Sequence, residues 1–301
     1  MNPTSSEYQN VFRRYDSIRA GYNGESNVDR HLSKISPTPQ LIVLQDINIQ
    51  INPQWFIQID TLIITNRYIL ILEIKSYRGI LHFEEDPYTL IQINDEDSFV
   101  RRCPQLQARS YIEGIKEWLN RHGFNLPVYA NIVLGFPTAQ VRTAPKLIKL
   151  IQAEEVPFRI RELNKNYPAV ISDENVKLLA NLLKASNDPY MAFPLCEYYR
   201  LDPNLIRTGV ICRKCGSHLQ KQSQATWWCN SCLIIVEKAS VRAIEDWLIL
   251  MKTTISNEEC RKWLGLKDKY AANYLLKKSK LEAIGNSKAR KYQFSSKFSL
   301  R

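Results

Sequence analysis

The sequence lacks any long apolar run, internal repeat or low-complexity tract. No stretch approaches the roughly 18 apolar residues that a membrane-spanning helix needs. The opening residues MNPTSSEYQN do not follow the basic-then-apolar pattern of a signal peptide. We therefore expect a cytoplasmic protein with no membrane partner. With 45% apolar and 24% charged residues the composition is ordinary for a soluble protein, and 301 residues are enough for two or three domains.

Acidic residues are scarce in the last third of the chain. Residues 1–205 hold 22 Lys and Arg against 23 Asp and Glu, a net charge of −1, whereas residues 206–301 hold 19 against 7, a net charge of +12. A basic module beside a neutral one is typical of a nucleic-acid-binding attachment, because such charge neutralises phosphates. The alternative is a basic face kept for solubility.

Two consecutive apolar segments carry acids at matched positions. Residues 56–65 (FIQIDTLIIT) and 68–77 (YILILEIKSY) read as the two strands of a hairpin. If the two residues between them form the loop, Asp60 lies opposite Glu73, at a spacing that suits two carboxylates sharing one divalent cation. Lys75 projects from the same strand face as Glu73. Such charges are costly to bury without a metal or partner, although an acidic pair could also simply border solvent.

Four linked blocks of sequence resemble the NERD (nuclease-related) domain, a branch of the PD-(D/E)XK nuclease superfamily. They are 21–32 (GYNGESNVDRHL), 58–65 (QIDTLIIT), 73–79 (EIKSYRG) and 104–107 (PQLQ). The resemblance covers about residues 15–140, with the blocks in the family's order. It implies a PD-(D/E)XK nuclease-like α/β fold, a mixed sheet flanked by helices.

The chain departs from the family pattern at two places. Thr61 stands where a histidine commonly follows the metal-site aspartate, and Cys103-Pro104 stands where Asn-Pro is common. Neither departure touches the acidic pair or the lysine, so both bear on substrate details more than on activity.

The resemblance implies a Mg²⁺-dependent (or Mn²⁺-dependent) nuclease acting on DNA. Asp60, Glu73 and the carbonyl of Ile74 would hold the ion, since hard oxygen ligands suit Mg²⁺. Lys75 would position the attacking water or neutralise charge on the phosphate. By resemblance, Glu25 and Gln107 would complete the site, although Gln107 could equally be a surface residue. The alternatives are a non-catalytic DNA-binding or assembly protein built on an inactive nuclease fold, and a nuclease directed at RNA.

The cysteines predict a second module. Cys212 and Cys215 form one C-x-x-C knuckle, Cys229 and Cys232 form another, and 13 residues separate the two. Four thiolates at this spacing match a zinc ribbon holding a structural Zn²⁺, with redox pairs and rubredoxin-like iron as competing interpretations. The module is too small for a core of its own, so the metal is expected to hold its fold.

The last 60 residues resemble a winged helix-turn-helix. A helix over 240–253 is followed by a second helix that Ser256 and Glu259 cap, and by a third over about 269–280. A short two-stranded wing follows. The third helix carries polar residues on one face that would bind nucleic acid: Lys269, Asn273, Lys277 and Lys280. The alternative is a three-helix packing module with a solvated lysine face.

These patterns divide the chain into four parts. A nuclease-like domain is expected over 1–185, a linker over 186–205, a four-cysteine zinc ribbon over 206–238 and a helix-turn-helix, winged-helix-like DNA-binding domain over 239–301. Within the first part, a helix is expected over 24–35, and helices over 104–121, 144–152 and 171–185 are expected to flank the sheet. Its strands are expected over 41–51, 56–65, 68–77 and 128–136, with a further strand pair near 79–94.

Overall fold

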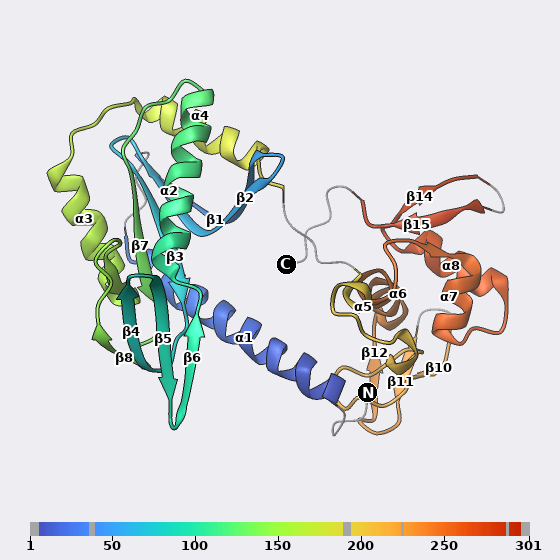
Figure 1. Ribbon diagram of the computed structural model, residues 1–301. Helices are drawn as coiled ribbons and strands as arrows, with labels where there is room; N and C mark the ends of the chain where they lie inside the picture. Colours follow the sequence, from blue (N-terminus) through green and yellow to red (C-terminus); the bar gives the residue numbers. More distant parts are fainter. Residues whose placement is uncertain (1–5, 36–39, 189–193, 224–225, 287–288, 296–301) are drawn as a thin grey trace. The chain divides into compact units, whose positions relative to one another are not determined.

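The computed structural model describes residues 6–35, 40–188, 194–223, 226–286 and 289–295 (Figure 1). The described residues fall into two compact units. The first lies within Phe12–Tyr190, and the second lies within Met191–Arg301, together with the first residues of helix α1. We describe each unit by itself.

A five-stranded mixed sheet forms the centre of the first unit. Its strand order is β1-β2-β3-β7-β9, with β1, β2 and β3 antiparallel and β3, β7 and β9 parallel. The strands are β1 (Leu41–Asn52), β2 (Trp55–Thr65), β3 (Ile69–Lys75), β7 (Val128–Leu134) and β9 (Leu150–Gln152). Strands β3 and β7 are apolar almost throughout, as expected of central strands covered on both faces.

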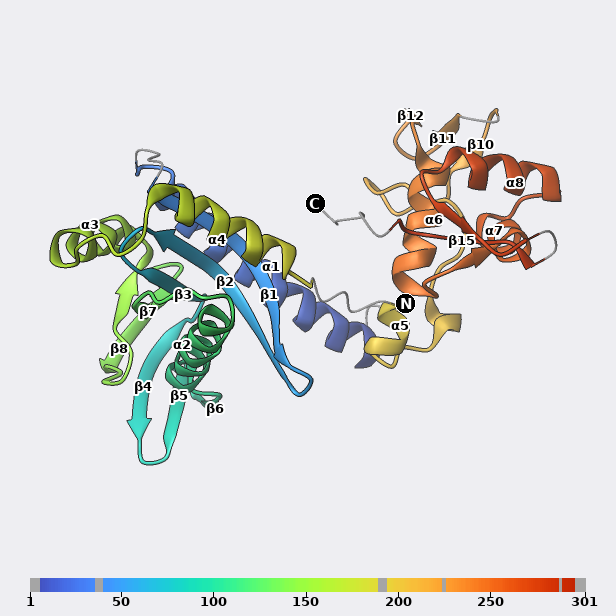
Figure 2. The same ribbon diagram turned by 90° about the horizontal axis from the view of Figure 1, so that it is seen from above.

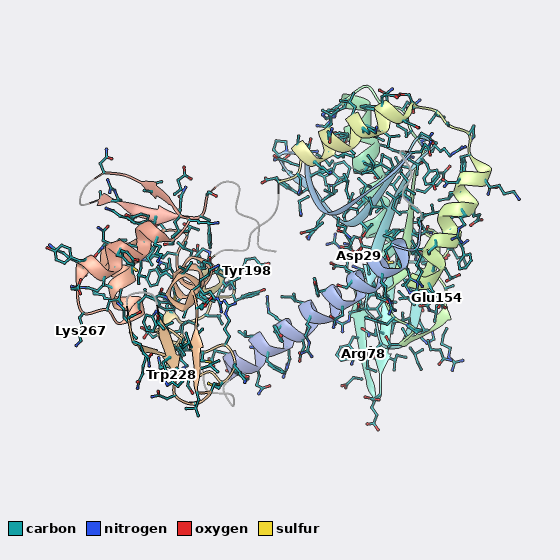
Figure 3. All side chains as sticks on the ribbon, turned by 180° about the vertical axis from the view of Figure 1, so that it is seen from behind. Asp29, Arg78, Glu154, Tyr198, Trp228 and Lys267 are labelled. Carbon is teal, nitrogen blue, oxygen red and sulfur yellow. The ribbon has the colours of Figure 1, made fainter. Side chains whose placement is uncertain are left out.

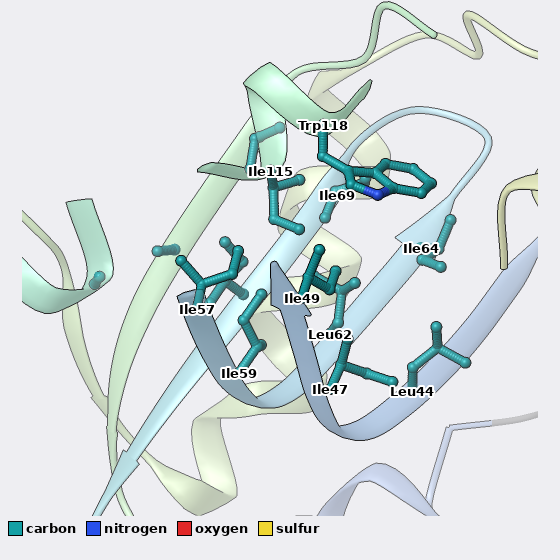
Figure 4. Packing of buried hydrophobic residues seen from close by; sticks show 14 of the residues in the cluster. Leu44, Ile47, Ile49, Ile57, Ile59, Leu62, Ile64, Ile69, Ile115 and Trp118 are labelled. Carbon is teal, nitrogen blue, oxygen red and sulfur yellow. The ribbon is translucent and has the colours of Figure 1, made fainter. Parts of the chain in front are cut away.

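Helices cover the two faces with separate apolar clusters. Helix α2 (Pro104–Arg121) and helix α4 (Asp173–Ala185) pack on one face, where Trp118 and Ile115 lie over the isoleucines of β1 and β2 (Figure 4). Helix α1 (Ser6–Leu32) and helix α3 (Val156–Asn166) contribute to the cluster on the other face. Figures 1 and 2 show α2 and α1 on opposite sides of the strands.

A second, four-stranded sheet lies in the same unit, in the order β6-β5-β4-β8. Its strands are β4 (Gly79–Glu85), β5 (Tyr88–Asn94), β6 (Asp97–Arg101) and β8 (Ala139–Thr143). The strand pair expected near 79–94 is therefore confirmed, whereas β6 and β8 were not predicted. Because only three residues separate β4 from β3, this sheet begins close to the predicted site residues Glu73 and Lys75.

Two expectations for the first unit were wrong. Residues 144–152 are not helical: this stretch ends in β9, which pairs in parallel with β7, and a short 3₁₀ turn, Ala153–Glu155, follows. A single helix, α1, also replaces the separate helix expected over 24–35 and begins as early as Ser6. In the first case sheet pairing overrides the helical spacing of the apolar residues.

The second unit begins with the short helix α5 (Leu195–Tyr198) and the 3₁₀ turn Pro203–Leu205. A small antiparallel sheet follows, and it bears the cysteines on the segments around β10 (Gln220–Lys221), β11 (Trp227–Cys229) and β12 (Ile234–Val236). Three helices and a three-stranded sheet complete the unit: α6 (Ala239–Leu250), α7 (Asn257–Leu264), α8 (Lys269–Lys278), β13 (Ile255–Ser256), β14 (Glu282–Ile284) and β15 (Lys291–Gln293).

One apolar cluster joins the cysteine-bearing sheet to these helices. It contains Cys212, Cys229 and Trp227 from the first part and Trp247 and Trp263 from the helices. The expected fold class is confirmed: mixed sheets flanked by helices, a small antiparallel sheet bearing four cysteines, and a C-terminal α/β module.

Candidate active site and cysteine cluster

The β2–β3 hairpin has the predicted register. Thr61 pairs with Leu72 and Ile64 pairs with Ile69, and Thr65 closes the turn by donating its backbone N–H to the carbonyl of Tyr68 at 3.0 Å. The next step of this register places Asp60 opposite Glu73. The regular pairing stops one residue before that position.

A bend in β1 and β2 places Asp60 at the point where pairing stops. Pairing with β1 passes from Gln45–Thr61 to Ile47–Ile59 across Asp46, whose φ of 49° is in the left-handed region. The alternation of buried side chains along β2 shifts by one residue here, because Ile57 and Ile59 before Asp60 lie in the same apolar cluster as Leu62 and Ile64 after it. The strand therefore turns at Asp60, and its carboxylate becomes available to groups beyond the ladder.

The Asp60 carboxylate accepts the backbone N–H of Ile74 at 2.7 Å. This bond fixes the side chain against the end of β3. Burial raises the pKa of Asp60, while the hydrogen bond from Ile74 and the nearby Lys75 ammonium lower it, and the net shift is upward. A carboxylate in this position is held in place but remains costly to ionise.

Glu73 is the most deeply buried acid of the site, with 1% of its side chain exposed. Neither of its carboxylate oxygens accepts a hydrogen bond of regular geometry, although Lys75 Nζ lies 2.5 Å from Oε1 as an ion pair. Burial, and after it the charge of Asp60, raises the pKa of Glu73 to about 7. Burial alone would lower the pKa of Lys75, but the Glu73 carboxylate raises it.

Helix α2 brings Gln107 to the same site. Pro104 occupies the first turn of the helix, and Gln107 lies about one turn further on. The side-chain carbonyl of Gln107 lies 3.4 Å from Lys75 Nζ, and its amide donates to the Tyr111 hydroxyl at 2.7 Å. The structure thus joins Gln107 to Lys75, and it adds Tyr111, which the sequence analysis missed because nothing in its local pattern marks it.

Helix α1 presents Glu25 through an unusually close packing contact. A Cβ on Gly24 would lie 2.2 Å from Ser76 Oγ, and a Cβ on Gly135 would lie 2.6 Å from the Cα of Gly24. The two glycines therefore let α1 cross directly over the ends of β3 and β7. Asn27 secures the crossing by donating to the Gly135 carbonyl at 2.6 Å.

The pKa of Glu25 is affected by the charged residues of the same site. Burial raises the pKa of Glu25, and the carboxylate of Asp60 raises it further, whereas Lys75 opposes the shift. Three carboxyl groups with raised pKa values thus interact electrostatically with one lysine, an arrangement that concentrates unfavourable negative charge. Shifts of this kind gather at functional sites.

The four cysteines of the second unit meet as predicted. Their sulfur atoms all lie within 4.8 Å of one another, a geometry consistent with a zinc ribbon. The two knuckles are built alike: Gly216 donates its N–H to the Cys212 carbonyl at 2.8 Å, and Leu233 donates to the Cys229 carbonyl at 2.8 Å.

Each knuckle turns through a left-handed residue. Gly216 has φ 73° and Leu233 has φ 54°, so a leucine occupies a position that favours glycine. Hydrogen bonds from Ser217 lower the pKa of the exposed Cys215 thiol to about 6. A lowered thiol pKa favours the thiolate that metal binding requires.

The C-terminal helices confirm the predicted capping of the second helix but shorten the third. Ser256 and Glu259 form the capping box, and Asp268 caps α8 by accepting two backbone N–H groups. Helix α8 ends at Lys278, so Lys280 lies beyond it rather than on its face.

The exposed face of α8 combines lysines with tyrosines. Lys269 and Lys277 are exposed and Asn273 is half-buried. Tyr270 and Tyr274 were not predicted; they are 73% and 41% exposed, and each has a lysine ammonium over its ring. A run of exposed aromatic and cationic side chains at helical spacing was the signal that could have revealed them.

The first unit thus has the form of an α/β domain with a buried acidic site at the end of its central strands. Residues 20–135 match the family described as NERD, the nuclease-related domain, and this part of the chain is a nuclease-related domain. Comparison with curated proteins and with solved structures finds no match. Throughout the described residues, each helix is too short or too polar to cross a membrane.

Proposed function

We propose that the protein is a metal-dependent nuclease of the PD-(D/E)XK type that hydrolyses phosphodiester bonds in DNA. The observation that carries this proposal is the meeting of Asp60, Glu73 and Lys75 at the end of the β2–β3 hairpin, with both Glu73 oxygens lacking regular hydrogen bonds. Lys75 neutralises at most one of the two buried carboxylates, so the remaining negative charge is destabilising unless a further cation compensates it.

The residues present fit a hard divalent cation. Asp60, Glu73 and the Ile74 carbonyl would hold Mg²⁺ or Mn²⁺. In a strand the N–H and C=O of one residue point to the same side, and the Ile74 N–H points to Asp60, so its carbonyl faces the same edge. When bound, the ion would polarise the scissile phosphate and lower the pKa of a water molecule.

The remaining side chains act on the phosphate and the water. Lys75 would place a fixed positive charge where negative charge develops on the phosphate. Gln107, held by Tyr111, would keep the ammonium of Lys75 oriented and present its amide to the substrate. Glu25 would contribute a further carboxylate for a metal or for the attacking water.

The second unit supplies binding in this proposal. Residues 206–238 would form a ribbon around a structural Zn²⁺, residues 239–301 would bind DNA through Lys269, Asn273, Lys277 and Lys280, and residues 186–205 would link them to the nuclease domain of residues 1–185. Support comes from the cysteine geometry and from the excess of basic residues after residue 205.

The test is cleavage by the purified full chain. Supercoiled, linear and branched DNA and RNA are incubated with Mg²⁺ and with EDTA, and we expect cleavage of DNA with Mg²⁺ only. Asp60→Ala, Glu73→Ala and Lys75→Ala should each reduce the rate by at least about a hundredfold. Glu113→Ala, which removes an exposed acid from the surface of α2, is the matched control and should retain the rate.

Activity retained by Asp60→Ala or Glu73→Ala would contradict the assignment. Cleavage of RNA in place of DNA would redirect it to the alternative substrate. Measured binding of DNA with no cleavage of any substrate would favour the alternative of a non-catalytic DNA-binding protein.

A further inference from the structure

A cleft of about 610 Å³ adjoins Lys75 within the first unit. Helix α1, the segment between β3 and β4, and strands β5 and β6 line it. Its walls carry three arginines that the sequence analysis did not single out: Arg19, Arg78 and Arg101. They come from separate parts of the chain, so no local motif marks them.

A buried glutamine holds two of these arginines in place. Gln92 is 5% exposed, and its side-chain carbonyl accepts from Arg101 Nε at 3.0 Å. Its amide donates to the backbone carbonyl of Arg78 at 2.8 Å. Arg78, labelled in Figure 3, precedes Gly79, whose φ of 72° lets the chain pass close to the Ile93 carbonyl. The positions of Arg78 and Arg101 are therefore built into the fold.

The positive charge of the cleft is poorly compensated. Across the described residues, no acidic side chain lies within ion-pair distance of Arg78 or Arg101. Arg19 pairs with Asp16 at 3.4 Å, but both side chains are largely exposed and such a pair is weak. The cleft therefore presents an anion-binding wall that leads to Lys75.

We propose that this cleft binds the sugar–phosphate backbone of one nucleic-acid strand beside the scissile bond, with Arg78 and Arg101 contacting phosphates. This inference rests on the proposed nuclease function. Guanidinium groups match phosphate oxygens through paired N–H donors. A volume of about 610 Å³ is that of a small-ligand pocket, so the cleft admits a segment of one strand at a time.

The experiment uses the full chain in EDTA, so that binding is measured without cleavage. The probes are an oligothymidylate of about ten nucleotides and a blunt duplex of equal length. Accessible arginines are modified with phenylglyoxal and mapped by mass spectrometry with and without each probe. We expect the single strand to protect Arg78 and Arg101, and to leave Arg161, an exposed arginine of α3 outside the cleft, unprotected.

A paired set of variants measures the same contacts energetically. Arg78→Gln with Arg101→Gln should reduce the dependence of single-strand affinity on salt by about 1.4 in the slope of log K against log salt, roughly 0.7 for each phosphate contact. Arg142→Gln with Arg161→Gln removes the same charge from exposed positions outside the cleft and should change the slope by less than half as much.

Equal protection of all three arginines, protection by the duplex alone, or equal slopes in the two double variants would overturn the proposal. Failure of the nuclease function gives a different result. If protection is specific to Arg78 and Arg101 but Mg²⁺ supports no cleavage, the cleft stands and the catalytic assignment falls. If DNA is cleaved but Arg78 and Arg101 are not specifically protected, the catalytic assignment stands and the cleft proposal falls.

Discussion

The acidic site of the first unit and the cysteine cluster of the second contribute in opposite ways to the stability of their folds. The acids lie among the central strands of a large sheet, with apolar clusters on both faces. The cysteines lie in and beside strands of only two or three residues, and two of them are part of the apolar cluster itself. Burial of the acids lowers the stability of a fold whose apolar clusters do not depend on them. The cysteine cluster, in contrast, is part of what holds the second unit together.

The pKa shifts of the two sites also differ. Burial raises the pKa values of Asp60, Glu73 and Glu25, so protons compete with a cation there. At the cysteines, hydrogen bonds lower the pKa of Cys215 while the hydrogen bond with Cys215 raises the pKa of Cys232 to about 12, so one thiolate of this pair is favoured. Under the proposed function, this contrast predicts that a metal at the acidic site exchanges freely and that a metal at the cysteines is retained.

Replacing a ribbon cysteine should have the largest effect. Cys212→Ser or Cys229→Ser should abolish binding of the single zinc expected per chain. Because these cysteines share a cluster with Trp247 and Trp263, tertiary structure should be lost from the cysteine-bearing sheet through helices α6–α8, and the first unit should stay folded. Elemental analysis and hydrogen exchange along the chain measure the two outcomes.

The matched control is Cys196→Ser, which changes another buried cysteine of the same unit outside the cluster of four. It should retain zinc. Iron in place of zinc, or a folded second unit in metal-free Cys212→Ser, would contradict the difference drawn between the two sites.

The parts of both sites that follow from local patterns were predictable. The hairpin register depends on two residues between two apolar strands, and the knuckles depend on cysteine spacing. The capping box of Ser256 and Glu259 likewise lies at the helix end it defines. In each case the determining residues are close in sequence.

The features that were missed depend on contacts between distant residues. The bend at Asp46 and Asp60 arises where two strands turn together, and the β9 strand forms because β7 is available to pair with it. The arginine cleft depends on Gln92, whose two partners come from the β3–β4 segment and from β6. The spacing of apolar residues along the chain does not indicate which distant residues come into contact.

A charge-removal variant of the second unit should have an intermediate effect. Changing Lys269, Lys277 and Lys280 to Gln together should lower the affinity for duplex DNA by at least about tenfold. The salt slope should fall by about 2 to 3, because each lost phosphate contact removes roughly 0.9. Zinc content should not change.

The control for this variant changes Lys165, Lys177 and Lys184, three exposed lysines of the first unit, to Gln. Filter binding over a salt series compares the two triple variants. An equal loss of affinity in both would show that general charge, and not the face of α8 with its adjoining Lys280, determines binding.

The smallest effect concerns the cost of the acidic site itself. The pKa of Glu73 is about 7 in the metal-free folded protein and near 4.5 in the unfolded chain. Between these pH values the folded state holds a proton that the unfolded state has released, so stability should fall as pH rises. Melting temperatures measured in EDTA from pH 5 to pH 8 should therefore fall by a few degrees more in the wild type than in Glu73→Gln. Mg²⁺ at pH 8 should restore the wild type and leave Glu73→Gln unchanged, because only the wild type gains a compensated carboxylate. Parallel pH profiles for the two proteins would mean that burial of Glu73 imposes no such cost, and the contrast with the cysteine cluster would then rest on metal retention alone.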